Sequence, residues 1–297
     1  MISATHVLID ASTRPIALLG DPVAHSFSPL IHNTGFRVQG LSYVYLACRV
    51  PPQALAEAVA GLRALGFAGA NVTIPHKEAV LPLLDRCTPG AKAVGAVNTI
   101  LCLSNAQGKT ELVGENTDVA GFLAPLKPFL PSLENSEVVI LGAGGAARAV
   151  VYALLTHVHP ARLTLLARNP KRGETLATDM AAYDTRHVLR VVPFAAAGAA
   201  VRTAHLVVNA TPVGMHPHDQ ETPWPHATDF HEGQLVYDLI YNPLRTRLLR
   251  EAAARGATTI GGLEMLLAQA AAAYKWWTGH ELPLQAVRAA LQSSLGS

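Results

Sequence analysis

A glycine-rich turn is the sequence feature that most constrains the fold of this chain. It follows the apolar run VVIL, it opens a helical pattern, and it consists of Gly142, Ala143, Gly144, Gly145, Ala146 and Ala147. The spacing fits G-x-G-x-x-G/A, in which glycines permit a tight turn and bring backbone amides close to a pyrophosphate at a helix N-terminus. The string alone would indicate only a tight turn, but the strand before it and the helix after it predict a dinucleotide-binding site.

The turn belongs to an α/β unit that fills the second half of the chain. A helix is expected from Pro170, and five apolar runs read as strands: VVIL, LTLLAR, VLRVVPF, HLVVNAT and QLVYDLIY. Strands joined by helical crossovers predict a doubly wound, Rossmann-like domain. The loop NATPVGM would face the cofactor, because it follows the carboxyl end of a strand.

The first half of the chain shows the same alternation of predicted strands and helices. Strands are expected at PIALLG, YVYLACRV and GANVTI, with helices after Ser28-Pro29, through ALAEAVAGLRALG and from His76. This order predicts a parallel sheet covered by helices, with NTILCLSN and KTELVGEN forming a hairpin at its edge. The segment LKPFLPSLENSE resembles a surface connection between domains, and GGLEMLLAQAAAAYKWWTG is expected to be a buried helix.

The predicted fold class is therefore α/β with two domains. An N-terminal substrate-binding domain is expected over residues 1–117 with 263–297, and a nucleotide-binding domain over residues 118–262.

Composition narrows the function to small-molecule chemistry. The formal charge is only +2 and like charges form no long runs, which argues against a nucleic-acid partner. Three irregularly spaced cysteines are interpreted as reduced, buried thiols, and no metal site is expected. The chain shows neither a signal-peptide pattern nor a membrane-spanning run, so a cytoplasmic protein is expected, as a monomer or a homodimer.

The residue at the end of the second nucleotide-domain strand indicates which cofactor is used. An NAD enzyme carries Asp or Glu there to hold the ribose 2′-hydroxyl, but this chain has Arg168, with Lys171 and Arg172 close behind. Cations suit a 2′-phosphate, so NADP(H) is predicted, although a solvated basic helix start would look the same.

Polar residues also gather at the strand ends of the first unit. Ser26 and Ser28 follow the first strand, Thr73 and Lys77 follow the third, and Asn98 and Asp118 add an amide and a carboxylate. Ser28 could equally be a helix N-cap, and a lone lysine is usually a surface charge. The whole set, however, suits a small polyhydroxylated acid.

Eight segments in order resemble the shikimate dehydrogenase family nearly end to end. They are GDPVAHSFSPLIHN, NVTIPHK, GAVNT, GENTD, GAGGAARA, NATPVGM, YDLIYNP and GGLEMLLAQAAAAYKWWTG. The resemblance implies reduction of 3-dehydroshikimate to shikimate with NADPH, within aromatic amino acid biosynthesis.

The resemblance also implies the roles of individual residues. Lys77 and Asp118 would form the catalytic dyad, and Tyr241 would lie near the substrate. Shikimate would be bound by Ser26, Ser28, Thr73, Lys77, Asn98, Asp118 and Gln269, with Gln269 placed beside Ser26 by the returning C-terminal helices.

On the cofactor side, the resemblance places the dinucleotide on residues 142–147 and its 2′-phosphate at Arg168 and Arg172. Met215 and Gly262 would lie near the nicotinamide. The family's usual Asn-Arg-Thr reads Ala167-Arg168-Asn169 here, so Asn169 stands at a cofactor-binding position and one adenosine contact is open to doubt.

Several alternatives remain open at this stage. His25, His32 and His76 adjoin the candidate site and could be rival acids, although such histidines more often bond backbone groups. A quinate/shikimate dehydrogenase of broader specificity, a non-catalytic sensor of shikimate or NADPH, and another two-domain NADP dehydrogenase would share parts of the pattern.

Overall fold

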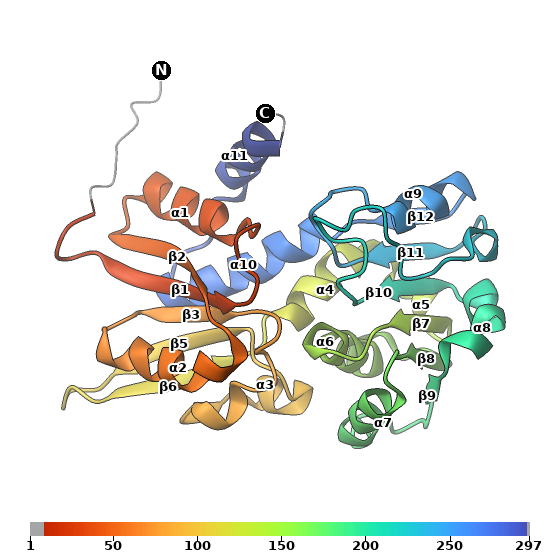
Figure 1. Cartoon of the computed structure of the whole chain (residues 1–297), viewed down its shortest axis with the longest axis horizontal. Helices are drawn as coiled ribbons and strands as arrows, with labels where there is room; N and C mark the ends of the chain where they lie inside the picture. The colour runs from red at the N-terminus through yellow and green to blue at the C-terminus, as the bar shows by residue number, and fades with distance from the viewer. Residues whose placement is uncertain (1–8, 296–297) are drawn as a thin grey trace. The chain divides into compact units, whose positions relative to one another are not determined.

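The computed structural model describes residues 9–295, which form two compact units. Unit 1 contains residues up to 117 together with the C-terminal residues from 269, and unit 2 contains residues 118–268. The return to unit 1 falls inside helix α10 (Leu263–Thr278), later in the chain than the predicted return at residue 263. Both units are α/β, and Figure 1 labels most of their helices and strands.

Unit 1 is built on one six-stranded sheet with the order β2-β1-β3-β5-β6-β4. Its strands are β1 (Arg14–Gly20), β2 (Tyr43–Arg49), β3 (Gly69–Val72), β4 (Arg86–Cys87), β5 (Thr99–Ser104) and β6 (Thr110–Glu115). Its helices are α1 (Ser28–Gln39), α2 (Leu55–Ala64), α3 (Pro89–Val94), the second part of α10, and α11 (Leu284–Leu295).

The sheet of unit 1 is mixed, whereas the sequence predicted a parallel sheet with a hairpin at its edge. Strands β2, β1 and β3 are parallel, but β5 runs antiparallel to β3 and to β6. The predicted hairpin is confirmed, yet the short strand β4 pairs with β6 and takes the edge position. Two residues are too few to give a recognisable strand pattern in a sequence.

The helix expected from His76 does not form. Residues 75–80 make turns, and only the short 3-10 segment Leu81–Leu83 follows. Pro75 and Pro82 enclose the segment, and a proline both lacks an N–H and disfavours helical backbone in the residue before it. Lys77 therefore lies in a turn and not on the first turn of a helix.

The core of unit 1 follows the period of its strands. Ala17 and Leu19 of β1 pack under α2 with Ala70 and Val72 of β3, while Ile16 and Leu18 point to the opposite face. That opposite face is covered by α1, which contacts α11. Both faces of the three parallel strands are thus closed, as parallel sheets require.

His32 lies at the centre of an aromatic cluster under α1. Its ring stacks on Tyr45 at a centroid distance of 4.5 Å and meets Trp277 edge-on at 5.2 Å, with Phe36 and Tyr274 further out. The ring is fully buried, and neither nitrogen has a hydrogen-bond partner among the described residues. The expectation that His32 bonds a backbone group is therefore wrong.

Unit 2 is built on a parallel six-stranded sheet with the order β12-β11-β10-β7-β8-β9. Its strands are β7 (Glu137–Leu141), β8 (Arg162–Leu166), β9 (Leu189–Val192), β10 (Leu206–Asn209), β11 (Leu235–Asp238) and β12 (Thr258–Ile260). Its helices are α4 (Asp118–Leu126), α5 (Leu130–Leu133), α6 (Gly145–Ala153), α7 (Pro170–Asp179), α8 (Gly198–Thr203), α9 (Arg247–Ala254) and the start of α10. If β7 is counted as the first strand of the unit and the order is read from β9, it becomes 3-2-1-4-5-6. This is the strand order of a doubly wound dinucleotide-binding sheet.

Two expectations about unit 2 need correction. The sequence indicated five strands, and the structure adds β12, whose three residues do not make a recognisable pattern. The segment LKPFLPSLENSE does not connect the units, because it forms a 3-10 turn and α5 inside unit 2, where Leu126 and Leu133 are buried. Its prolines occupy helix-starting positions, which suit proline as well as a loop does.

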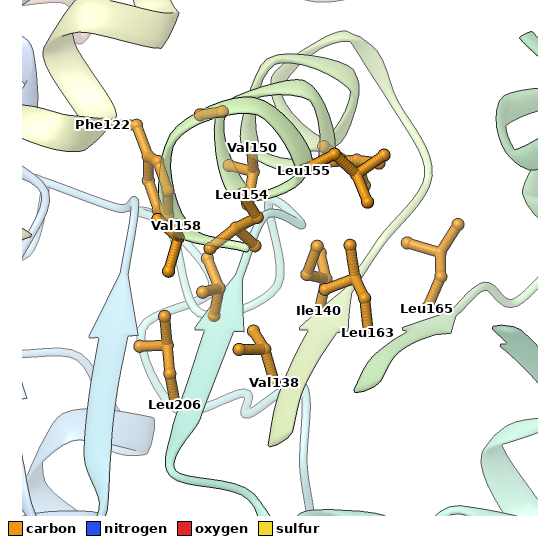
Figure 2. Packing of buried hydrophobic residues seen from close by; sticks show 14 of the residues in the cluster. Phe122, Val138, Ile140, Val150, Leu154, Leu155, Val158, Leu163, Leu165 and Leu206 are labelled. Atoms are coloured by element: carbon orange, nitrogen blue, oxygen red, sulfur yellow. The ribbon is translucent and has the colours of Figure 1, made fainter. Parts of the chain in front are cut away.

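Alternate side chains of the unit 2 strands enter two separate cores. Val138 and Ile140 of β7 pack under α6, whereas Val139 and Leu141 pack on the other face under α8 and α9. Figure 2 shows the first core, with Val150 and Leu154 facing Ile140 and its neighbours. Because both faces of β7 are buried, the position of its carboxyl end is fixed. The glycine-rich turn begins at this end.

Two further features concern the cysteines and the helices. Cys102 is buried, but Cys48 and Cys87 are only partly buried, so the expectation of three buried thiols holds for one of them.

No helix among residues 9–295 combines the length and apolar character needed to cross a bilayer.

His32 makes the stability of unit 1 depend on pH. Burial lowers the pKa of its imidazole to about 3, below the value of about 6.5 expected in the unfolded chain. The unfolded state therefore binds the proton first, so stability is complete above about pH 6.5 and falls by up to about 1.4 kcal/mol per pH unit as the pH drops from there toward 3. His32→Phe should remove this component, as urea unfolding between pH 4.5 and 7.5 would measure.

The control for His32 is His280→Phe at an exposed position of the same unit. It should unfold with the pH dependence of the unchanged protein. An identical slope in the His32→Phe and unchanged proteins would contradict the interpretation.

Candidate functional site

Ser26 and Ser28 lie together where the chain passes from β1 into α1. The Oγ of Ser26 donates to the Oγ of Ser28 over 3.2 Å, and it accepts the backbone N–H of Ser28 over 3.2 Å. The N-cap of α1 is Phe27, so Ser28 is the first helical residue and its hydroxyl does not cap the helix. The two hydroxyls are therefore paired with each other, and their role in binding a ligand stays a prediction.

Thr73 follows β3 and packs against the end of β1. A Cβ on Gly20 would lie 2.2 Å from Cγ2 of Thr73, so only glycine allows this approach. The N–H of Thr73 donates to Leu19 O over 2.9 Å, and the N–H of Asp21 donates to Ile74 O over 2.9 Å. The loops after β1 and β3 are thus joined side by side.

The position of these two loops is a binding position in parallel sheets. The order β2-β1-β3 means that the chain leaves β1 toward one side and later returns to its other side. Where the strand order reverses in this way, the loops diverge and leave a crevice at the carboxyl ends of the strands. The structure therefore brings Ser26, Ser28, Thr73 and Lys77 to one such edge.

Lys77 is held by its backbone next to the residues that lead into β5. Its carbonyl accepts the N–H of Val97 over 2.8 Å, and its side chain is partly buried. The neighbouring His76 is buried, with Nε2 lying 2.6 Å from Val50 O. His76 is thereby engaged by backbone, and His32 is buried under α1, which leaves exposed His25 as the remaining rival acid.

Asn98 lies at the centre of a buried polar network. Its Nδ2 donates to Thr117 Oγ1 over 3.0 Å and to Gln269 Oε1 over 3.5 Å, and its Oδ1 accepts the N–H of Thr117 over 2.8 Å. Asp118 follows Thr117 directly, begins α4 and is buried. Gln269 reaches Asn98 because the C-terminal residues return to unit 1, whereas its placement beside Ser26 stays a prediction.

Three residues that support Asn98 were not among the predicted site residues. Asn71 Nδ2 donates to Asn98 O over 2.9 Å and to Thr99 Oγ1 over 3.1 Å, while Tyr45 OH donates to Asn71 Oδ1 over 2.7 Å. Thr99 in turn donates to Asn98 Oδ1 over 3.1 Å. A signal was available for Asn71, which stands within the apolar strand β3, because buried polar side chains need partners.

In unit 2 the glycine-rich turn lies at the reversal between β7 and β10. Gly142 has φ +111°, and a Cβ there would lie 2.9 Å from Thr211 Cγ2 and 3.0 Å from Ala210 O. Gly144 caps α6, and a Cβ on it would meet no atom within 4 Å. The first turn of α6 therefore presents free space and unpaired N–H groups together, as a pyrophosphate requires.

Arg168, Asn169 and Arg172 lie at the carboxyl end of β8, and all three are exposed. Asn169 caps α7, because its Oδ1 accepts the N–H of Lys171 over 3.1 Å. Ala167 is buried, and a Cβ on Gly173 would approach it to 3.2 Å, so α7 packs closely on this strand end. Asn169 thus starts α7, and the small side chain of Ala167 allows the helix to pack closely on β8.

The remaining predicted residues follow the other strands of unit 2. Met215 lies in the loop after β10, where its N–H donates to Pro212 O over 3.1 Å. Tyr241 follows β11 and is partly buried. Gly262 donates its N–H to Ile240 O over 3.0 Å, and a Cβ on it would lie 2.2 Å from Leu239 O, so this position also requires glycine.

Comparisons with known proteins show the family to which the chain belongs. Residues 18–100 match the shikimate dehydrogenase substrate binding domain, and residues 262–292 match the shikimate 5′-dehydrogenase C-terminal domain. The chain is 56% identical over 287 residues to shikimate dehydrogenase (NADP(+)) of Salinibacter ruber, covering 96% of this chain and 99% of that protein.

Solved structures of a shikimate dehydrogenase and a quinate dehydrogenase are similar over nearly the whole chain. Shikimate 5-dehydrogenase from Thermus thermophilus in complex with NADP(H) and shikimate gives a TM-score of 0.80 at 38% identity, covering 95% of this chain and 100% of that one. Quinate dehydrogenase from Corynebacterium glutamicum in complex with NAD gives a TM-score of 0.82 at 33% identity, covering 95% and 99%.

Proposed function

Because the chain belongs to the shikimate dehydrogenase family, we propose that it interconverts shikimate and 3-dehydroshikimate with NADP(H), as an oxidoreductase of aromatic amino acid biosynthesis. The observation that carries this proposal is that both units place their predicted ligand residues at the point where the strand order of the sheet reverses. In each unit, the predicted ligand residues lie where the strand order reverses, polar hydroxyls and amides in unit 1 and the glycine turn in unit 2.

We assign the substrate to unit 1. Ser26 and Ser28 are paired hydroxyls that suit a carboxylate, while Thr73, Asn98 and Gln269 offer donors and acceptors for ring hydroxyls. Asn98 and Gln269 are already connected, so the site is preorganised before a ligand enters, which lowers the entropic cost of binding. Tyr241 is proposed as a further substrate contact from the family pattern alone.

We assign the cofactor to unit 2, whose residues fit a dinucleotide. The open space at Gly144 and the N-terminus of α6 suit the pyrophosphate. Arg168 and Arg172 are exposed cations at the strand end where an NAD enzyme carries a carboxylate, so NADP(H) is favoured. Met215 and Gly262 belong to the loops proposed for the nicotinamide side.

The chemistry requires a proton at the carbonyl oxygen of the substrate. Bound NADPH supplies the hydride, and negative charge develops on that oxygen as the hydride arrives. We propose that the Lys77 ammonium group delivers the proton and that the Asp118 carboxylate orients Lys77 and the substrate hydroxyl. The rigid loop around His76 fixes the backbone of Lys77, which helps to hold the acid in place.

The cellular location, partners and oligomeric state of the protein are proposed from its charge and its cysteines. The nearly balanced charge and the free thiols of Cys48, Cys87 and Cys102 fit a cytoplasmic enzyme of small molecules without nucleic-acid or membrane partners. Monomer and homodimer are both compatible with the proposal.

Substrate and cofactor choice can be tested together. We expect turnover of shikimate with NADP⁺ to exceed that of shikimate with NAD⁺ and of quinate with either cofactor, as nicotinamide absorbance would measure. Comparable rates with quinate or NAD⁺ would place the protein with the broader quinate/shikimate enzymes. Binding of NADPH without any turnover would favour the sensor.

Lys77→Met should lower kcat by roughly a hundred- to ten-thousand-fold, the usual contribution of a general acid, with little change in KM. Steady-state kinetics with shikimate would measure both constants. The matched control is Lys92→Met, an exposed lysine of the same unit, which should keep both constants. An unchanged kcat with a raised KM would assign Lys77 to binding instead.

Arg168→Ser should raise the KM for NADP⁺ by roughly ten- to a hundredfold and leave the KM for NAD⁺ nearly unchanged. The reason is that a charge-assisted hydrogen bond contributes about 1.5–3 kcal/mol. Arg255→Ser is the control, since Arg255 is exposed and precedes β12 at the amino edge of the same sheet. Equal losses with NADP⁺ and NAD⁺ would contradict a contact to the 2′-phosphate.

A further inference from the structure

Asp238 is a buried carboxylate to which the proposed mechanism assigns no role, although it lies in the segment YDLIYNP. It ends β11 and is 0% exposed. Its Oδ1 accepts Nδ2 of Asn209 over 2.9 Å and the N–H of Ile240 over 3.0 Å, and its Oδ2 accepts Oγ1 of Thr246 over 2.6 Å. Three donors therefore converge on one side chain, one from the end of β10 and two from the segment after β11.

The first donor connects Asp238 to the loop after β10. Asn209 Oδ1 accepts both the N–H and the hydroxyl of Thr211, over 2.9 Å and 2.7 Å, and Thr211 Oγ1 accepts the N–H of Val213 over 3.2 Å. Thr211 is also the side chain that packs against Gly142. Asp238 thus orients Asn209, and Asn209 shapes the loop that carries Met215 and bounds the glycine turn.

The other two donors connect Asp238 to the segment after β11. Ile240 accepts the N–H of Gly262 over 3.0 Å, so its backbone fixes the start of α10. Thr246 caps α9, since its Oγ1 also accepts the N–H of Leu249 over 3.3 Å. The N–H of His216 donates to Asn242 O over 3.0 Å, which joins the loops after β10 and β11.

Burying a carboxylate costs desolvation free energy, so Asp238 is not explained by stability alone. Burial raises the pKa of the Asp238 carboxyl to about 6, against the opposing effect of its three donors. Well-packed apolar residues are often as stabilising as a buried charge, so a buried carboxylate at this position points to a demand for fixed geometry. An acceptor with two oxygens can hold three donors in one arrangement, which an apolar side chain cannot.

We propose that Asp238 is a positioning residue for the nicotinamide half of the cofactor site. The carboxylate holds the loop 209–215 and the segment 239–246 in the arrangement that receives the dinucleotide, while the adenosine half at the end of β8 does not depend on it. In a doubly wound sheet, the two halves of a dinucleotide lie on opposite sides of the reversal, which here separates β8 from β10 and β11. The inference rests on the proposed function, because it needs unit 2 to bind NADP(H).

The test compares NADP⁺ with 2′,5′-adenosine bisphosphate, which carries the adenosine half alone. Asp238→Ala should weaken the calorimetric affinity for NADP⁺ by tenfold or more and that for the bisphosphate by less than twofold. Asp238→Asn keeps the acceptor for Asn209 and Ile240, so it should stay within threefold of the unchanged protein for both ligands. With shikimate present, kcat should fall for Asp238→Ala and recover in Asp238→Asn.

The control is Gln234→Ala, at the opposite end of the same strand. Gln234 is buried, and its Nε2 donates to Val201 O over 2.6 Å and to Ala204 O over 3.0 Å, at the amino edge of the sheet. It should lower the thermal unfolding midpoint without changing the ratio of the two affinities. An unchanged ratio in Asp238→Ala as well, whether both affinities fall or neither does, would overturn the proposal.

A second variant keeps the proposal testable if Asp238→Ala does not fold. Asn209→Ala removes the side chain that joins Asp238 to the loop 209–215, so it should weaken the affinity for NADP⁺ and leave that for the bisphosphate within twofold. An unchanged ratio of the two affinities would overturn the proposal. If the unchanged protein bound neither ligand, the proposed function would fail, and that result is distinct from any ratio among the variants.

Discussion

The structure depends on two close approaches, one in each unit, where a threonine packs against a glycine at the end of the first parallel strand. A Cβ on Gly20 would lie 2.2 Å from Thr73, and a Cβ on Gly142 would lie 2.9 Å from Thr211. Both contacts lie where the strand order reverses. Since any larger residue would force the neighbouring loops apart, glycine decides how closely the loops that carry the ligand residues can meet.

Around these approaches, buried polar side chains hold the loops more firmly than apolar packing could. Asn98 connects Thr117 and Gln269 in unit 1, and Asp238 connects Asn209 and Thr246 in unit 2. Apolar contacts are non-directional and tolerate small shifts, whereas a hydrogen bond loses strength steeply with angle. A site for hydride transfer needs the directional kind of support, because reacting atoms must be placed accurately.

Much of the fold could be predicted, and the failures have identifiable causes. Long strands with buried faces, such as β1 and β7, gave clear patterns, while β4 and β12 were too short to do so. The helix expected at His76 does not form between Pro75 and Pro82, and the segment 126–137 lies within unit 2. His32 and Asp238 went unrecognised as buried polar centres, because burial depends on what packs over a residue from distant parts of the chain.

The sequence by itself determined the fold class, the glycine turn, the Arg168 position and the set of polar residues at the strand ends, because these depend on local spacing and residue chemistry. Only the tertiary structure decided that Gln269 reaches Asn98, and that Asn71 and Asp238 support the loops. Those contacts join residues far apart in the chain, and the sheet order that brings them together is set by packing on both faces, which no local pattern records.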